Sequence, residues 1–186
     1  MRNAARAPRA VQAPELTIRL KQHPDGSASL TCVRRDGSST WQRQRAGYGL
    51  VFPPHDLTHY AVETTLGVRH GFYGLIADGW DITDFASPWP RGPIPFEAGE
   101  VELIVGLFDS ERLNMARWSE AEFRDHADRF IAARRATPGA TPGLTRQLSG
   151  ADLERVREAR AALLGRWGAL GPGEALELPF DRGALA

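Results

Sequence analysis

The stretch LTIRLK at residues 16–21 decides the fold class, because its apolar and polar residues alternate with the period of a β-strand. A Pro-Asp-Gly turn signal at residues 24–26 follows, and then a second strand-like run at residues 29–34. An Asp-Gly pair at residues 36–37 leads into a third run at residues 40–43. These short strands and tight turns predict an antiparallel meander, with one face packed on the core and the other in water.

The segment EALELPF at residues 174–180 also alternates, and Pro179 confines such a strand to the edge of a sheet. We therefore expect this strand to return to an edge of the N-terminal meander. Apolar periodicity predicts helices near residues 53–66, 71–79 and 99–115, from residue 119, and over residues 150–167. The sequence thus predicts one α+β domain over residues 15–186, with an N-terminal antiparallel β-meander joined by a C-terminal strand and packed against four to five helices.

Charge and composition limit the classes of partner. The chain has 23 basic and 23 acidic residues, so it lacks the basic excess of proteins that bind nucleic acid or anionic membranes. Cys32 is the only cysteine, which excludes an internal disulfide and a cysteine-based zinc cage and is typical of the cytoplasm. Residues 1–14 lack the apolar core of a signal peptide, so we expect a disordered tail. No apolar run approaches the length of about 20 residues that a membrane-spanning helix needs.

Side chains that carry chemistry gather in the segment HDLTHYAVE at residues 55–63. A proline pair precedes the segment and a glycine follows it, which is typical of a short helix with a defined start and stop. On such a helix His55 and His59 share one stripe with Val62 and Leu66, which is the spacing of a core-facing surface. Their Cβ atoms would lie about 5–6 Å apart, close enough for both imidazoles to bind one metal ion.

Two acids lie at the edge of the same stripe, Asp56 and Glu63. The segment between Pro53 and Val68 holds no Lys or Arg, so neither acid has a basic partner on its own helix. Buried imidazoles and carboxylates cost roughly several kcal/mol unless something satisfies them. A metal ion would satisfy them, and so would a hydrogen-bonded network with other segments.

The first function that this pattern predicts is a small cytosolic metal-binding protein, and more specifically a metal-dependent hydrolase of a small-molecule or peptide substrate. His55, His59 and Glu63 would bind a divalent metal ion such as zinc, and Asp56 would be the catalytic side chain that orients a histidine or a water. A third ligand from another segment is easier geometrically than Glu63, since His55 and Glu63 lie about 12 Å apart in rise along a helix. The alternatives for the third ligand are Asp78, Asp81, Asp84, His70 and His126.

The second predicted function is a non-catalytic interaction or assembly module. There the same side chains would form a buried polar network, joined by Arg69 or Arg112, that fixes the packing of helices. The chain contains no G-x-G-x-x-G, no Walker loop and no G-x-S-x-G motif. Nucleotide-binding and serine-hydrolase functions therefore lack their main support.

The segment HDLTH at residues 55–59 resembles the H-E-x-x-H helix of zinc metallohydrolases, in which both histidines bind zinc and the glutamate is the general base. This resemblance implies a zinc site at His55 and His59, with Asp56 in the place of the base and one methylene shorter. The wider pattern FPxHDLxHYxVE at residues 52–63, followed by GFYGL at residues 71–75, is similar to a family of uncharacterised bacterial proteins that share it after a short N-terminal sheet. That second resemblance implies one domain whose special region lies between residues 52 and 85.

Overall fold

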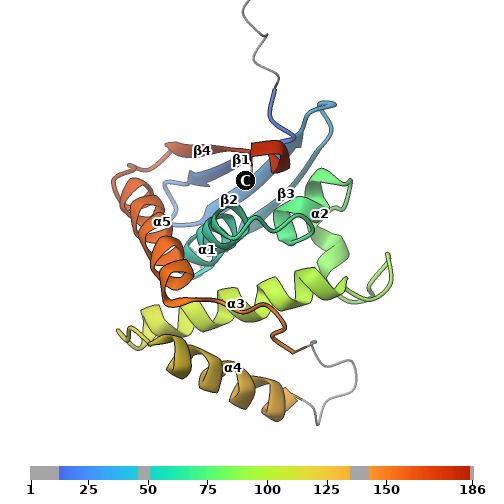
Figure 1. Ribbon diagram of the computed structural model, residues 1–186. Helices are drawn as coiled ribbons and strands as arrows, with labels where there is room; N and C mark the ends of the chain where they lie inside the picture. The colour runs from blue at the N-terminus through green and yellow to red at the C-terminus, as the bar shows by residue number, and fades with distance from the viewer. Residues whose placement is uncertain (1–12, 46–50, 135–142, 185–186) are drawn as a thin grey trace, which may run out of the picture.

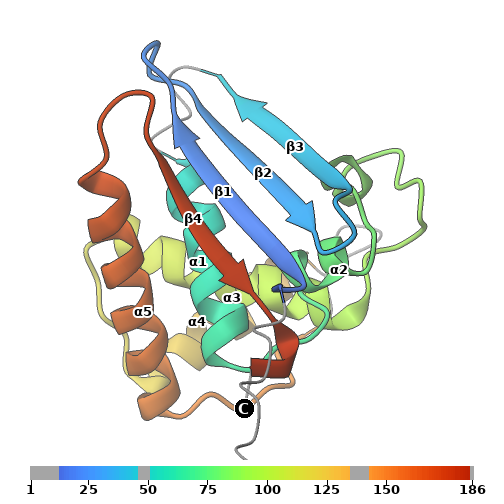
Figure 2. The ribbon, with the colours of Figure 1, turned by 90° about the horizontal axis from the view of Figure 1, so that it is seen from above.

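The computed structural model describes residues 13–45, 51–134 and 143–184, so most of the tail predicted at residues 1–14 lies outside the described residues. Four strands form one antiparallel sheet in the order β3-β2-β1-β4 (Figure 2). Their bounds are Leu16–Gln22 for β1, Ala28–Arg34 for β2, Ser39–Gln44 for β3 and Ala175–Phe180 for β4. The predicted α+β fold is confirmed, including the C-terminal strand, which pairs with β1 at an edge of the sheet.

The five α-helices in the described ranges all lie on one side of this sheet, as Figures 1 and 2 show. They are α1 (Phe52–Thr65), α2 (Phe72–Ala77), α3 (Phe96–Leu113), α4 (Glu120–Arg134) and α5 (Gly150–Gly168), with 3-10 turns at Ile82–Phe85 and Arg182–Ala184. α1 packs against both α3 and α5, and it lies between the sheet and α3 (Figure 1). None of the described helices is long and apolar enough to cross a membrane.

The alternation in β1 explains why only one face of the sheet is covered. Leu16, Ile18 and Leu20 are fully buried, whereas the residues between them reach the surface. In β4, Phe180 and Leu178 lie opposite Leu16 and Ile18 and extend the same apolar surface. Each such buried side chain contributes about 1.5–3 kcal/mol relative to exposure, and apolar residues of α1 belong to the same core. Because α1 shares this core and also packs against α3, it is held between the sheet and α3 (Figure 1).

A buried carboxylate fixes the turn between α1 and α2. Glu63 lies in the last turn of α1, and its Oε2 accepts backbone hydrogen bonds from Tyr73 and Gly74, each 3.1 Å long. Gly71 permits this approach, because a Cβ at that position would lie 2.5 Å from the carboxyl carbon of Glu63. The carboxylate of Glu63 is therefore held by the start of α2.

The apolar pattern of α3 conceals four acids beyond its first turn. Glu100 accepts backbone hydrogen bonds from the segment before α5, and Glu111 forms a buried ion pair with Arg157 of α5. Removal of one partner from the Glu111–Arg157 pair would leave an uncompensated charge, so Glu111 is tied to the fold, and Glu100 is tied to it by its backbone partners. The other two, Glu102 and Asp109, contact histidines of α1.

Candidate metal centre

Three metal-ligating side chains meet between α1 and α3. His55 and His59 come from α1 and Glu102 from α3, and one ligand atom from each lies within 4.8 Å of the others. The two imidazole centroids are 4.8 Å apart and the ring planes make an angle of 78°. The prediction that these imidazoles lie side by side is confirmed. In the part of the chain that the structure describes, no other group of three His, Cys, Asp or Glu side chains has this spacing.

The Nε2 atoms of both histidines lie next to the Glu102 carboxylate. His59 Nε2 is 3.1 Å from Oε2 of Glu102, and His55 Nε2 is 3.8 Å from Oε1. Zinc binds nitrogen and oxygen at about 2.0–2.2 Å in tetrahedral sites, which places neighbouring ligand atoms about 3–4 Å apart. The spacing of the two nitrogens from the carboxylate therefore suits a shared zinc ion.

A second carboxylate stands behind each imidazole. Asp109 Oδ2 is 2.8 Å from Nδ1 of His55. Glu63 Oε1 is 3.6 Å from Nδ1 of His59, which is beyond hydrogen-bond length, so that buried nitrogen has no hydrogen-bond partner among the described residues. Carboxylates in this position orient a ligand histidine and keep its other nitrogen available for a metal. Each ring thus has a carboxylate near its Nδ1 atom, and its Nε2 atom lies next to Glu102.

Burial falls steeply across the centre. The side chain of His59 is 4% exposed, that of His55 26% and that of Glu102 54%. The centre is therefore closed at His59 and open to solvent at Glu102. Burial by itself lowers the pKa of His59, but the carboxylates of Glu102 and Glu63 outweigh burial and raise the pKa to about 10. The raised pKa favours a protonated imidazole, whose single positive charge faces the carboxylates of Glu102 and Glu63.

The structure places the other two predicted site residues away from the three converging ligand atoms. Glu63, predicted as the third ligand, lies on the Nδ1 side of His59. Glu102 is instead the carboxylate whose oxygen lies within 4.8 Å of a nitrogen of each histidine. Asp56, predicted as the catalytic residue, is buried on the side of α1 that faces β3, where its carboxylate accepts a hydrogen bond of 3.0 Å from Gln44. Burial raises the pKa of Asp56 to about 6, although the neighbouring histidines oppose the shift.

The alternative third ligands are engaged elsewhere, and none belongs to the group around His55 and His59. Their partners are Glu97 for His70, Trp118 for His126, Arg182 for Asp78, and a shared helix cap for Asp81 and Asp84. Of the two arginines expected in a polar network, Arg112 reaches the centre, with its Nε 3.7 Å from Asp109. Arg69 offers its backbone carbonyl to Arg182 in a separate ion-pair cluster.

Glu102 is missing from the sequence prediction because apolar residues dominate the pattern of α3. A signal for it exists nevertheless: Glu102 and Asp109 are seven residues apart, so they lie on one stripe of an otherwise buried helix. Acids on such a stripe need polar partners. The pair therefore predicts a polar cluster facing α3, although it does not reveal that α1 supplies the other half.

Comparison with protein-family models, with curated proteins and with solved structures finds no match. The resemblances to zinc metallohydrolases and to a bacterial family therefore stay predictions.

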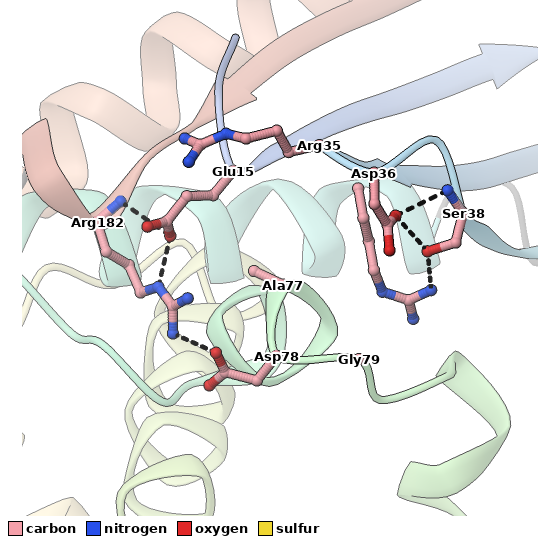
Figure 3. A pocket seen from close by; sticks show the side chains of 9 residues that line it. Glu15, Arg35, Asp36, Ser38, Ala77, Asp78, Gly79 and Arg182 are labelled. Atoms are coloured by element: carbon pink, nitrogen blue, oxygen red, sulfur yellow. Dashed lines mark hydrogen bonds and ion pairs between the residues drawn. The ribbon is translucent and has the colours of Figure 1, made fainter. Parts of the chain in front are cut away.

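A separate cleft of about 540 Å³ lies where the residue before β1, the residues after β4 and the β2–β3 turn meet the end of α2 (Figure 3). On one side of it Arg182 donates to Glu15 and pairs with Asp78 at 2.8 Å, and on the other side Ser38 donates to Asp36. The cleft shares no residue with the metal centre. The other two arginines that line it are paired as well, Arg34 with Asp81 and Arg35 with Asp181, so the cleft is best explained as an ion-pair cluster that joins the ends of the strands to the end of α2.

Proposed function

We propose that the protein binds one divalent metal ion, zinc in the first place, through Nε2 of His55, Nε2 of His59 and the carboxylate of Glu102. The observation that carries this proposal is the convergence of three ligand atoms from two helices, all within 4.8 Å of one another. Two histidines and one carboxylate are a donor set of catalytic zinc sites. The hydrogen bond between Nδ1 of His55 and Asp109 supports the proposal, since ligand histidines almost always have such a partner on their second nitrogen, and Glu63 lies 3.6 Å from the corresponding nitrogen of His59.

We infer further that the metal serves a reaction. Structural zinc sites use four protein ligands, whereas catalytic sites use three and keep a fourth position for water or substrate. The described residues supply three ligands here, and the exposed Glu102 puts them at the surface. The proposed activity is metal-dependent hydrolysis of a small-molecule or peptide substrate, in which the metal would act as a Lewis acid.

The rival proposal is a non-catalytic assembly module built on the same residues. A protonated His59 between Glu63 and Glu102, together with the His55–Asp109 hydrogen bond, would offset part of the negative charge of these carboxylates without a metal. Such a network would fix α1 against α3. The two proposals differ in one measurable respect, because only a metal centre responds to a chelator.

The test is elemental analysis of the full chain purified without an affinity tag, followed by zinc titration of the chelator-treated protein. We expect about one zinc per chain, because the centre offers one set of three ligands. Chelation should lower the melting temperature, since a ligand present at about 100 times its Kd stabilises the fold by about 2.7 kcal/mol. A protein that takes up no zinc and keeps its melting temperature would contradict the proposal and favour the assembly module.

Asp109→Asn should weaken zinc binding by about 10–100-fold while leaving all three ligands in place. Asparagine cannot present a negative charge to Nδ1 of His55, now 2.8 Å from the Asp109 carboxylate, so the imidazole becomes a weaker donor. The measurement is the zinc Kd from competition with a chromophoric chelator. Asp125→Asn, on the exposed side of α4, is the matched control and should leave the Kd unchanged. Equal Kd values for the two variants would show that the Asp109 carboxylate does not support a metal-binding imidazole at His55.

A further inference from the structure

In the part of the chain that the structure describes, a fourth ligand can reach the proposed metal only from the exposed side of the centre. The inner side is closed, because the ring centroids of Phe72 and His59 are 5.2 Å apart and the carboxylate of Glu63 lies near Nδ1 of His59. The exposed side is formed by His55 and Glu102. A substrate must therefore approach along α3, beside Glu102.

A glycine lies next to Glu102 on this side of α3. Glu102, Gly106 and Asp109 have the spacing i, i+4, i+7 and share one stripe, and the two acids both lie against His55. A Cβ added at Gly106 would meet none of the described residues within 4 Å, so close packing among them does not require a glycine there. Glycine also weakens a helix relative to alanine. Neither packing nor helix formation therefore explains why position 106 is a glycine.

A side chain at position 106 would extend toward the proposed metal, because of the direction in which helical side chains lean. Side chains on an α-helix lean toward its N-terminus, so one at position 106 would extend back over the turn that carries Glu102. We propose that Gly106 keeps open the approach by which a small oxygen donor, such as water or the carboxylate or hydroxamate group of a substrate, reaches the metal. This inference rests on the metal centre proposed above, and it makes Gly106 a specificity-determining position.

The experiment titrates acetohydroxamate into the full chain loaded with Co²⁺ and follows the visible absorption of the cobalt. The wild type should bind both cobalt and acetohydroxamate. Gly106→Leu should bind cobalt, because its three ligands are unchanged, but should lose acetohydroxamate binding, because leucine fills the approach. Gly165→Leu is the matched control and should behave as the wild type, since Gly165 also lies within a helix and has nothing within 4 Å of an added Cβ.

Each outcome bears on one of the two proposals. A wild type that binds no cobalt overturns the metal centre and this inference with it. A wild type that binds cobalt but not acetohydroxamate, or a cobalt-loaded Gly106→Leu variant that binds it normally, overturns the open approach and leaves the metal centre standing. If leucine displaces cobalt itself, Gly106→Ala decides: with cobalt retained, weaker acetohydroxamate binding supports the inference and unchanged binding overturns it.

Discussion

Replacing His59 by alanine should abolish zinc binding and make the melting temperature insensitive to chelator. His59 is the most buried of the three proposed ligands, and its Nε2 lies 3.1 Å from Glu102. Without it only His55 and Glu102 remain, and two protein ligands are fewer than zinc sites use. The measurements are zinc titration and thermal unfolding of wild type and variant, each with and without chelator. The wild type should lose stability on chelation, and the variant should not.

His70→Ala provides the matched control, because His70 is an exposed histidine that pairs with Glu97 rather than with the centre. It should keep the zinc affinity and the chelator response of the wild type. If the centre is only a polar network, His59→Ala should instead destabilise the fold by about 1–3 kcal/mol through its unpaired partners, and chelator should affect neither protein. A wild type that ignores chelator would therefore decide for the assembly module.

The sheet can be predicted from sequence because its signals are local. The alternation that buries Leu16, Ile18 and Leu20 is visible within six residues, and Asp-Gly and Pro-Asp-Gly turns mark the hairpins. The pairing of β4 with β1 joins distant segments, yet Pro179 and the apolar alternation restrict that strand to an edge. Patterns of this kind determine which face is buried, and burial then determines the register.

In the candidate metal centre, too, local spacing predicts some contacts, whereas others depend on the packing of distant segments. The proximity of His55 and His59 follows from helical spacing alone, whereas Glu102 is 43 residues from His59 and meets it only because α1 packs on α3. Helical spacing also places Glu63 near His59, but it cannot show that the backbone N–H groups of α2 hold the carboxylate on the Nδ1 side. Asp56 turns toward Gln44 for a comparable reason, since the sheet supplies its partner.

The affinity for zinc should rise about tenfold per pH unit between about pH 6 and pH 8, because a ligand histidine must give up its proton. In the metal-free protein the carboxylates of Glu102 and Glu63 outweigh burial and hold the pKa of His59 at about 10. His59 is therefore protonated throughout that range, and each zinc ion that binds must displace about one proton. Competition with a chelator of known affinity at each pH gives the slope. Calorimetry in two buffers with different ionisation enthalpies counts the protons released.

The stability of the metal-free protein should depend on pH through the same proton. The pKa of His59 is higher in the folded chain, about 10, than the value of about 6.5 in the unfolded chain. The stabilising contribution of the charged imidazole is therefore fully present below about pH 6.5 and is lost as the pH rises through about 10. Metal-free protein should thus lose stability between those values, and His59→Ala should lose less, as denaturant unfolding at each pH would show. A zinc affinity that is independent of pH above about 7, together with a flat stability profile, would mean that His59 is neutral in the metal-free protein.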